Sequence, residues 1–375
     1  MDLSRVDAPE SDLPRHSLTN PADLAHTSDV EIGPLTLANG ERLDYVVQRV
    51  TQYGALNHNR SNVVVVPHAL TGSSRVLDWW NGMVGSQKLF DPAHWCVIGI
   101  NALGSCYGST GPASPAPDGA PYASRFPIVG VDDMVAAQQR ALEKLGIDRI
   151  AVVIGGSLGG MQALTWALAH GALVDHAIMV GAYDAFSAMG IGFNAVARQA
   201  IYNDPEFAGG DYPPDVQPTQ GVRLARMIAM LTYKSDILFE TRFGNRLDRA
   251  GGDPARNRAD RFDVEGYLAY QGDIFAKRMD ANAYLALTRA MDLFDVRDRL
   301  PADRSPRLSF IGIENDWLFP RHYVERAAAR FAALGYDCTY RTLATNHGHD
   351  AFLAEAEALA QILAPDMRFK TTRPA

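Results

Sequence analysis

The chain has 375 residues, of which 47% are hydrophobic and 21% are charged, a balance typical of globular proteins that excludes a disordered or collagen-like chain. Its 35 Lys and Arg residues against 43 Asp and Glu residues leave a net charge of −8, which argues against the basic face that nucleic-acid binding requires. No apolar run reaches the roughly 18 residues of a membrane span, and 3 cysteines without a CxxC pair favour a reduced, cytoplasmic protein over a disulfide framework or a zinc site.

Residues 1–28 are rich in Pro, Asp, Ser and His without periodicity, and we expect them to form a flexible tail without an export signal. From residue 29 onward, short β-branched or apolar runs alternate with helical patterns. The runs predict strands at 32–37, 43–51, 63–67, 95–100, 150–154 and 176–180. The later four runs are typical of strands buried on both faces of a parallel sheet. Helices are predicted at 132–145 and 158–170.

The alternation stops after Gly181. Between 184 and 304, apolar residues recur at helical spacing and no buried strand is evident. The earlier pattern then returns, with predicted strands at 308–313 and 337–343 and predicted helices at 321–334 and 351–362. A helical block between two strands of one sheet is typical of a cap over the carboxyl edge of that sheet. We therefore expect an α/β core of residues 29–183 and 305–375, with a helical cap (lid) domain at 184–304.

The segment 149–164, RIAVVIGGSLGGMQAL, predicts a strand, a sharp turn of the form Gly-x-Ser-x-Gly, and a helix. Such a turn exposes its serine at a helix N-terminus and requires small neighbours, because the backbones approach closely. We interpret Ser157 as the nucleophile of an α/β-hydrolase fold with a mostly parallel sheet. A degenerate dinucleotide loop would need an acidic residue about 20 positions further on, at the end of a following strand, and none is found. A glycine-rich packing turn with an incidental serine is the other alternative.

The partners of such a serine follow later strands, in the order acid and then histidine. The strand at 308–313 leads into Asp316, with Glu314 as the rival acid, and the strand at 337–343 leads into His349. The acid would orient the imidazole, which would accept the serine proton. His347 and His349 could also form part of a metal site, but no further cluster at ligand spacing supports that alternative.

Once these residues are placed, the chain resembles the homoserine O-acyltransferase family from about residue 32 to the last helix. The matching segments are HALTG (68–72), DWWNGMVG (78–85), NALGSCYGSTGPAS (101–114), RFP (125–127), GGSLGGMQAL (155–164), FNAVARQAI (193–201), GVRLARMIAMLTY (221–233), QGDIFAKRMDANAYLALTRAMD (271–292) and GHDAFL (348–353). The resemblance implies an α/β-hydrolase-fold enzyme of methionine biosynthesis that works without a bound cofactor. It also implies ping-pong transfer of acetyl from acetyl-CoA through an acyl-serine to the hydroxyl of L-homoserine, and a homodimer joined through cap helices.

The resemblance assigns the chemistry to single positions. Ser157, Asp316 and His349 match the nucleophile, the acid and the base of the family. Leu70 and Leu158 match the residues whose backbone N–H groups form the oxyanion hole. Two donors aimed at the tetrahedral oxygen are what acyl transfer requires.

Four further positions match residues that bind substrate in the family. Arg226 and Tyr233, seven positions apart, match the pair that holds the carboxylate of the amino acid. Asp350 matches the residue that faces the ammonium group, and Thr71 lies in the matching HALTG segment as a further substrate contact. A guanidinium that forks onto a carboxylate is chemically reasonable. Surface ion pairing or helix capping are the alternative roles for Arg226 and Asp350.

Departures from the family pattern concern specificity. Leu158 and Phe294 replace residues common in acetyl-using members and also resemble succinyl-using members. Succinyl-CoA as donor and serine as acceptor therefore stay as alternatives, as does an esterase or thioesterase that uses the same triad with water. An anionic CoA thioester would also need a locally positive entrance, for which Arg75, Lys88 and Arg125 are candidates.

Overall fold

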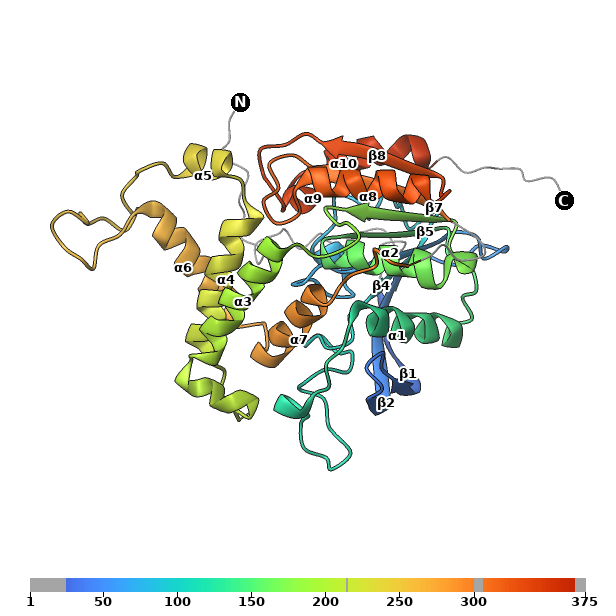
Figure 1. Cartoon of the computed structure of the whole chain (residues 1–375), viewed down its shortest axis with the longest axis horizontal. Helices are drawn as coiled ribbons and strands as arrows, with labels where there is room; N and C mark the ends of the chain where they lie inside the picture. Colours follow the sequence, from blue (N-terminus) through green and yellow to red (C-terminus); the bar gives the residue numbers. More distant parts are fainter. Residues whose placement is uncertain (1–24, 214, 300–305, 368–375) are drawn as a thin grey trace.

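The computed structural model describes residues 25–213, 215–299 and 306–367. Within these residues a single eight-stranded sheet has the order β1-β2-β4-β3-β5-β6-β7-β8 (Figure 1). The strands are β1 (His26–Thr36), β2 (Arg42–Tyr53), β3 (Val63–Pro67), β4 (Cys96–Ile100), β5 (Val152–Gly156), β6 (His176–Val180), β7 (Arg307–Ile313) and β8 (Cys338–Leu343). β1 and β2 pair antiparallel, as do β2 and β4, and the remaining pairs are parallel. The predicted mostly parallel α/β sheet is confirmed.

Strands β3 to β6 are buried along their whole length because both faces of the sheet are covered. Val63 and Val65 of β3 pack in one apolar cluster with residues of α1 (Val131–Lys144), α2 (Leu158–Ala169) and α8 (Arg321–Ala333). Val64 and Val66 pack in a second cluster with residues of α9 (Ala351–Ala354) and α10 (Ala356–Leu363). Successive side chains of a strand point to opposite faces, so this continuous valine run supplies two core layers at once.

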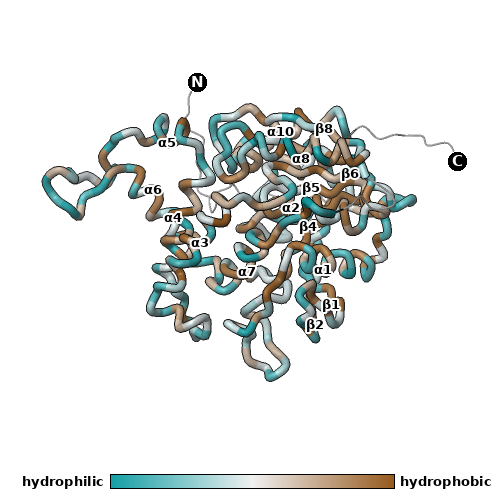
Figure 2. Tube along the Cα trace, viewed as in Figure 1, coloured by the Kyte–Doolittle hydropathy of each residue, from teal (hydrophilic) through white to brown (hydrophobic). Residues whose placement is uncertain are grey.

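Five helices lie between β6 and β7 within the described residues: α3 (Ala188–Tyr202), α4 (Thr219–Tyr233), α5 (Asp236–Arg242), α6 (Asp263–Ala276) and α7 (Ala281–Asp292). Figure 1 shows α3, α4 and α6 standing together to one side of the sheet, with the connection from α5 to α6 projecting outward. That projecting connection is largely hydrophilic (Figure 2). No helix in the described part of the chain is long and apolar enough to cross a membrane.

The sequence expectation was wrong in two places. β1 begins at His26, so residues 26–28 belong to the sheet rather than to a tail; residues 1–24 of that predicted tail lie outside the described residues. The predicted helix at 351–362 is broken at Glu355, where the backbone leaves helical geometry. Glu355 turns its carboxylate back to the hydroxyl of Thr345, which lies 2.6 Å away. A side-chain contact of this kind leaves no trace in local periodicity. The predicted boundary at 304/305 also lies outside the described residues.

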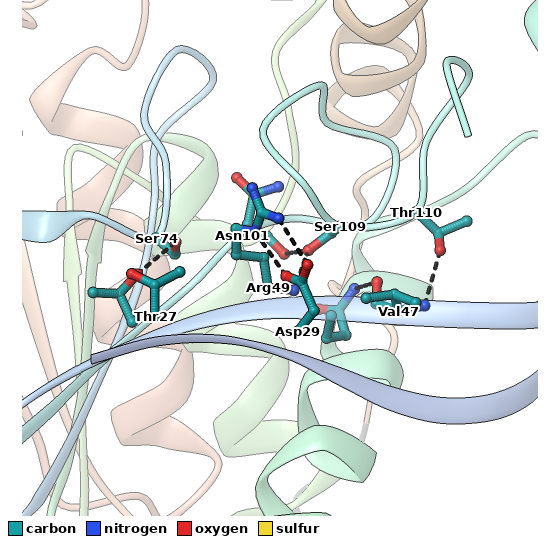
Figure 3. Close-up of polar contacts among 10 residues, drawn as sticks. Thr27, Asp29, Val47, Arg49, Ser74, Asn101, Ser109 and Thr110 are labelled. Atoms are coloured by element: carbon teal, nitrogen blue, oxygen red, sulfur yellow. Dashed lines mark hydrogen bonds and ion pairs between the residues drawn. The ribbon is translucent and has the colours of Figure 1, made fainter. Parts of the chain in front are cut away.

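The loop that follows β4, residues 101–111, packs against β2 near the β1 edge of the sheet (Figure 3). Arg49 of β2 forms a bidentate ion pair with Asp29 of β1, at 2.7 Å for each contact. The Arg49 backbone N–H donates to the hydroxyl of Ser109, which in turn donates to the carbonyl of Asn101 at 2.8 Å. Gly108 lies against the guanidinium, where a Cβ would come within 2.3 Å of Arg49 Cζ. These contacts fix the loop at 101–111 along β2.

Candidate active site

Ser157 occupies the turn between β5 and α2. Its backbone has φ 56° and ψ −125°, a conformation that L-residues other than glycine rarely adopt. The turn is held because the Ser157 N–H donates to the carbonyl of Val180 at 2.9 Å and its carbonyl accepts from Met161 N–H at 3.0 Å. The Ser157 side chain accepts no capping hydrogen bond from α2, so its hydroxyl is not used to end the helix.

The glycines around Ser157 are required by backbone contact. A Cβ on Gly155 would lie 2.3 Å from the carbonyl carbon of Gly159, and one on Gly159 would lie 2.4 Å from the carbonyl oxygen of Pro67. A Cβ on Gly160 would lie 2.6 Å from the Cβ of Ala182. These distances are far below van der Waals contact, so a residue larger than glycine would clash at each of these three positions. They also show that the start of α2 touches the loop after β3.

His349 and Asp316 are brought together from different loops. Nδ1 of His349 lies 2.7 Å from Oδ2 of Asp316, and both side chains are almost fully buried. The other oxygen of Asp316 accepts hydrogen bonds from the N–H groups of Leu318 at 2.9 Å and Phe319 at 2.8 Å. Asp316, rather than Glu314, is therefore the acid that contacts the imidazole. Because Nδ1 donates to a carboxylate, Nε2 is left as the acceptor of the ring.

The surroundings of His349 suit a general base. Nε2 is buried and has no hydrogen-bond partner among the described residues. Phe319 stacks on the imidazole with ring centroids 5.0 Å apart, and Tyr233 lies on another side at 6.0 Å. Burial lowers the pKa of His349, but the charge of Asp316 and the hydrogen bond to it raise the pKa by more, so the net pKa lies above the usual 6.5.

His347 has a different environment from His349. Its Nδ1 lies 2.5 Å from a carboxylate oxygen of Glu355, and its backbone N–H donates to the hydroxyl of Thr345 at 2.9 Å. The two histidines therefore use separate acids. Within the described residues, no group of three or more His, Cys, Asp or Glu side chains could hold a metal ion.

Ser157 opens into a pocket between the carboxyl edge of the sheet and the helices inserted after β6. The lining residues come from loops of the core and from α3, α4 and α7: Leu70, Ser157, Phe193, Asn194, Ala197, Ile228, Ala229, Thr232, Tyr233, Tyr284, Met291 and Leu318. Tyr233 links this pocket to His349, and Leu318 links it to Asp316. The lining is mostly apolar, which is what excludes water from a reactive intermediate.

Two backbone N–H groups belong to the segments that meet at the pocket: Leu70 is a lining residue, and Leu158 directly follows the lining residue Ser157. Leu158 is the first residue of α2, and Leu70 lies in the loop after β3. Within the described residues, neither Leu70 N–H nor Leu158 N–H donates a hydrogen bond. Leu158 N–H also lies at the positive end of the α2 dipole, so both groups can stabilise developing negative charge beside Ser157.

The residues expected to bind substrate lie close to this pocket. Arg226 on α4 is only 3% exposed, and its guanidinium stacks over the rings of Tyr233 at 5.5 Å and Phe275 at 4.9 Å. The carbonyl of Thr71 accepts a hydrogen bond from Arg278 at 2.9 Å. Stacking on aromatic rings holds the plane of a guanidinium and prepares it for a planar anion.

Two cations near the site are absent from the sequence expectations. Lys234 lies 3.2 Å from Oδ2 of Asp350, and this contact raises the pKa of Lys234 despite the opposing effect of burial. Arg278, which lies two residues after the end of α6, contacts Thr71. The position of Lys234 directly after Tyr233 was the only sequence signal for it. The contact between Arg278 and Thr71 could not be predicted from the sequence, because the two residues are 207 positions apart.

The three cations expected at a positive entrance are instead paired with acids at the surface. Arg75 lies 2.7 Å from Asp78, Lys88 lies 2.8 Å from Glu357, and Arg125 lies 2.7 Å from Asp118. These neutralised, exposed pairs are poor candidates for binding an anionic substrate. Arg226 stacks on the pocket residue Tyr233, Lys234 directly follows Tyr233, and Arg278 contacts the carbonyl of Thr71 next to Leu70, so these three cations lie nearer the site.

Comparison with known proteins agrees with this architecture. A family model described as the alpha/beta hydrolase fold matches residues 62–356. A homoserine O-acetyltransferase of Carboxydothermus hydrogenoformans is 38% identical over 370 residues, covering 94% of this chain and 97% of the relative. A homoserine O-succinyltransferase of Bordetella avium is 42% identical over 347 residues, covering 86% and 83% of the two chains. Among solved structures, esterase E22 has a TM-score of 0.84 at 26% identity, covering 92% of this chain and 100% of that one.

Proposed function

The chain belongs to the homoserine O-acyltransferase family of α/β hydrolases, and on this premise we propose that it transfers acetyl from acetyl-CoA to the hydroxyl of L-homoserine, a step of methionine biosynthesis. The observation that carries the proposal is the pocket at Ser157, which is lined in part by α4, the helix that bears Arg226 and Tyr233. Next to Ser157 and in the loop after β3, the N–H groups of Leu158 and Leu70 donate no hydrogen bond within the described residues. Acetyl-CoA acts as a co-substrate, and no bound cofactor is needed.

In the first half-reaction, Oγ of Ser157 attacks the thioester carbonyl while Nε2 of His349 accepts the hydroxyl proton. The N–H groups of Leu70 and Leu158 stabilise the tetrahedral oxyanion. Asp316 stabilises the imidazolium that forms, as its 2.7 Å contact with Nδ1 permits. The carbon–sulfur bond then breaks, His349 returns the proton to the leaving thiolate, and CoA departs from an acetyl-serine.

In the second half-reaction, the homoserine hydroxyl attacks the acetyl-serine and gives its proton to His349, which returns it to Ser157 as the ester product leaves. We propose that Arg226 binds the amino-acid carboxylate and that Tyr233 and Thr71 border the bound acceptor. Asp350 pairs with Lys234 through Oδ2, and its other oxygen would receive the substrate ammonium. Holding the acceptor lets a dilute amino acid compete with about 55 M water.

Two other reactions have specific support. Relatives that are 42% identical are homoserine O-succinyltransferases, which favours succinyl-CoA as the alternative donor. The likeness to esterase E22 favours hydrolysis of the same acyl-serine. Acceptance of serine by the same acceptor site is a third variant, since its ammonium and carboxylate present the same charges.

A steady-state panel that crosses acetyl-CoA and succinyl-CoA with L-homoserine and L-serine tests the proposal. We expect the highest kcat/KM for acetyl-CoA with L-homoserine, by about tenfold or more over each other pair, which corresponds to about 1.4 kcal/mol. A preference for succinyl-CoA would reassign the donor. Free acid released at the same rate with and without amino acid would establish the hydrolase instead.

Arg226 provides a sharper prediction about the acceptor. In Arg226→Ala, the acyl-enzyme should form from acetyl-CoA at nearly the normal rate. The activation free energy of the second half-reaction should rise by about 2–3 kcal/mol, the typical cost of losing a charge-assisted pair. Hydrolysis should then take a larger share of the product. Arg226→Lys should recover only part, because an ammonium cannot bind a carboxylate through two prongs. Burst and steady-state kinetics with and without L-homoserine measure these effects. Normal transfer by Arg226→Ala would remove Arg226 from the site.

We further propose that residues 184–304 form a cap domain on a core of residues 29–183 and 305–375, and that cap helices join two chains in a homodimer. Support comes from apolar side chains exposed on α3 and α4, among them Val196 at 58%, Leu224 at 47% and Leu231 at 50%. Light scattering should give twice the 40.9 kDa chain mass. The free thiols of all three cysteines and the CoA co-substrate suit the cytoplasm.

A further inference from the structure

Gln162 contacts both segments that carry the proposed oxyanion donors. It lies on α2, one turn after Leu158, and is fully buried. Its Nε2 donates to the carbonyl of Leu158 at 3.2 Å and to the carbonyl of His68 at 3.2 Å. His68 begins the loop that reaches Leu70. One amide group therefore bridges the start of the nucleophile helix and the loop after β3.

The orientation of the Gln162 amide follows from its neighbours. The indole N–H of Trp166 can only donate, and it donates to Oε1 of Gln138 at 2.8 Å. Nε2 of Gln138 must then face Gln162, and it donates to Oε1 of Gln162 at 2.6 Å. The NH₂ group of Gln162 is thereby turned toward the two carbonyls. All three side chains are fully buried, so no water competes for these bonds.

The loop after β3 is also fixed by hydrogen bonds of the His68 side chain. His68 is fully buried, and its Nε2 accepts the N–H of Ala102 at 2.9 Å while Nδ1 donates to the carbonyl of Ala69 at 2.6 Å. Burial lowers the pKa of His68 to about 4, so the ring is neutral and can make both contacts at neutral pH. Both ring nitrogens of His68 therefore hold the loop, and the carbonyl of the same residue receives the hydrogen bond from Gln162 on α2.

We propose that Gln162 is a positioning residue that sets the separation of the Leu70 and Leu158 N–H groups and so stabilises the tetrahedral intermediates of both half-reactions. The proposal rests on the function proposed above. Oxyanion donors act only when they lie about 2.7–3.1 Å from the charged oxygen. Because both donors are backbone groups, side-chain substitution cannot remove them. The distance between them then depends on contacts that tie α2 to the loop, and Gln162 donates hydrogen bonds to carbonyls on both segments.

Gln162→Met tests the proposal, because it keeps the length of the side chain and removes its hydrogen bonds. Trp166→Phe is the matched control: it removes the indole N–H at the far end of the same buried chain. The carbonyls of Leu158 and His68 can only accept, so they still hold the NH₂ group of Gln162 toward them in this variant. Gln162→Glu, which is isosteric and carries at most one donor proton, is the second variant if Gln162→Met is poorly folded. Rates are expressed per active site from the amplitude of the acyl-enzyme burst, so that unfolded protein does not count.

We expect acylation and deacylation of Gln162→Met to slow together, by about 10- to 100-fold, since both steps use the same two donors. KM for homoserine should change less than about threefold. Binding of a trifluoromethyl ketone, which forms an oxyanion on Ser157, should weaken in proportion to the loss of kcat/KM. Trp166→Phe should stay within about threefold of the wild type in all three measurements.

Three results would overturn the proposal: per-site rates of both Gln162 variants near those of the wild type, an equal loss in Trp166→Phe, or a loss confined to one half-reaction. Failure of the proposed function has a different signature. If the wild type forms no acyl-Ser157 with any acyl-CoA, the assignment of the nucleophile fails before Gln162 is tested. If the acyl-enzyme forms normally and Gln162→Met behaves as the wild type, the reaction stands and only the positioning role is lost.

Discussion

Ser157→Ala is expected to lower acyl transfer by about 10⁴- to 10⁶-fold, because it removes the proposed nucleophile and members of such a triad act as a unit. The protein should stay folded, since the change removes one hydroxyl that caps no helix and creates almost no cavity. With acyl-CoA alone, the wild type should gain one acyl group on the peptide that contains Ser157, and the variant should gain none. Mass spectrometry of the intact protein and of its peptides measures both.

A second serine provides the control for this experiment. Ser309 in β7 is also fully buried, and its hydroxyl contacts His176 at 2.8 Å, away from the pocket. Ser309→Ala should cost about 1 kcal/mol of stability and leave the rate within about threefold. A Ser157→Ala enzyme that keeps its rate within about tenfold of the wild type would show that Ser157 is not the nucleophile.

His349→Ala is expected to cost about 10³- to 10⁵-fold in both half-reactions, because each half-reaction needs the imidazole to accept a proton and return it. His347→Ala should cost less than about tenfold, since His347 contacts Glu355 and only supports the loop. The two residues are close in sequence, which makes them a matched pair. Burst kinetics for both variants measure the difference. Equal losses would point to a shared structural role for the pair.

The pH profile of the wild type gives an independent test of His349. Only neutral imidazole can accept the hydroxyl proton, and the pKa of His349 lies above 6.5 because the attraction of Asp316 outweighs burial. Activity should therefore rise with pH, with its half-maximum above 6.5. The contribution of His349 to the free energy of unfolding should change in the opposite direction and fall as pH rises. The contribution of the His349–Asp316 pair is fully present below about pH 6.5 and is lost as pH rises through the raised pKa.

Local pattern was sufficient for those features that depend on neighbours in sequence. The Gly-x-Ser-x-Gly turn could be predicted because part of its need for small residues is local. Gly155, for example, must lack a Cβ because the backbone of Gly159 lies against it. The buried strands of the parallel sheet, though not their order, could be predicted from uninterrupted apolar runs such as Val63–Pro67. Asp316 and His349 could be expected to meet, although 33 positions apart, because parallel strands end at the same edge of the sheet.

Tertiary structure alone decided the contacts that join distant segments. The sequence preferred Asp316 to its rival Glu314, but only the structure gives the 2.7 Å contact between the Asp316 carboxylate and the imidazole. The pairing of Lys234 with Asp350 and the bridge from Gln162 to His68 likewise join segments that have no common local pattern. The physical reason is the same in each case. Periodicity and turn chemistry report on the backbone within a few residues, whereas a buried polar group takes its partner from whichever donor or acceptor the completed packing brings within about 3 Å.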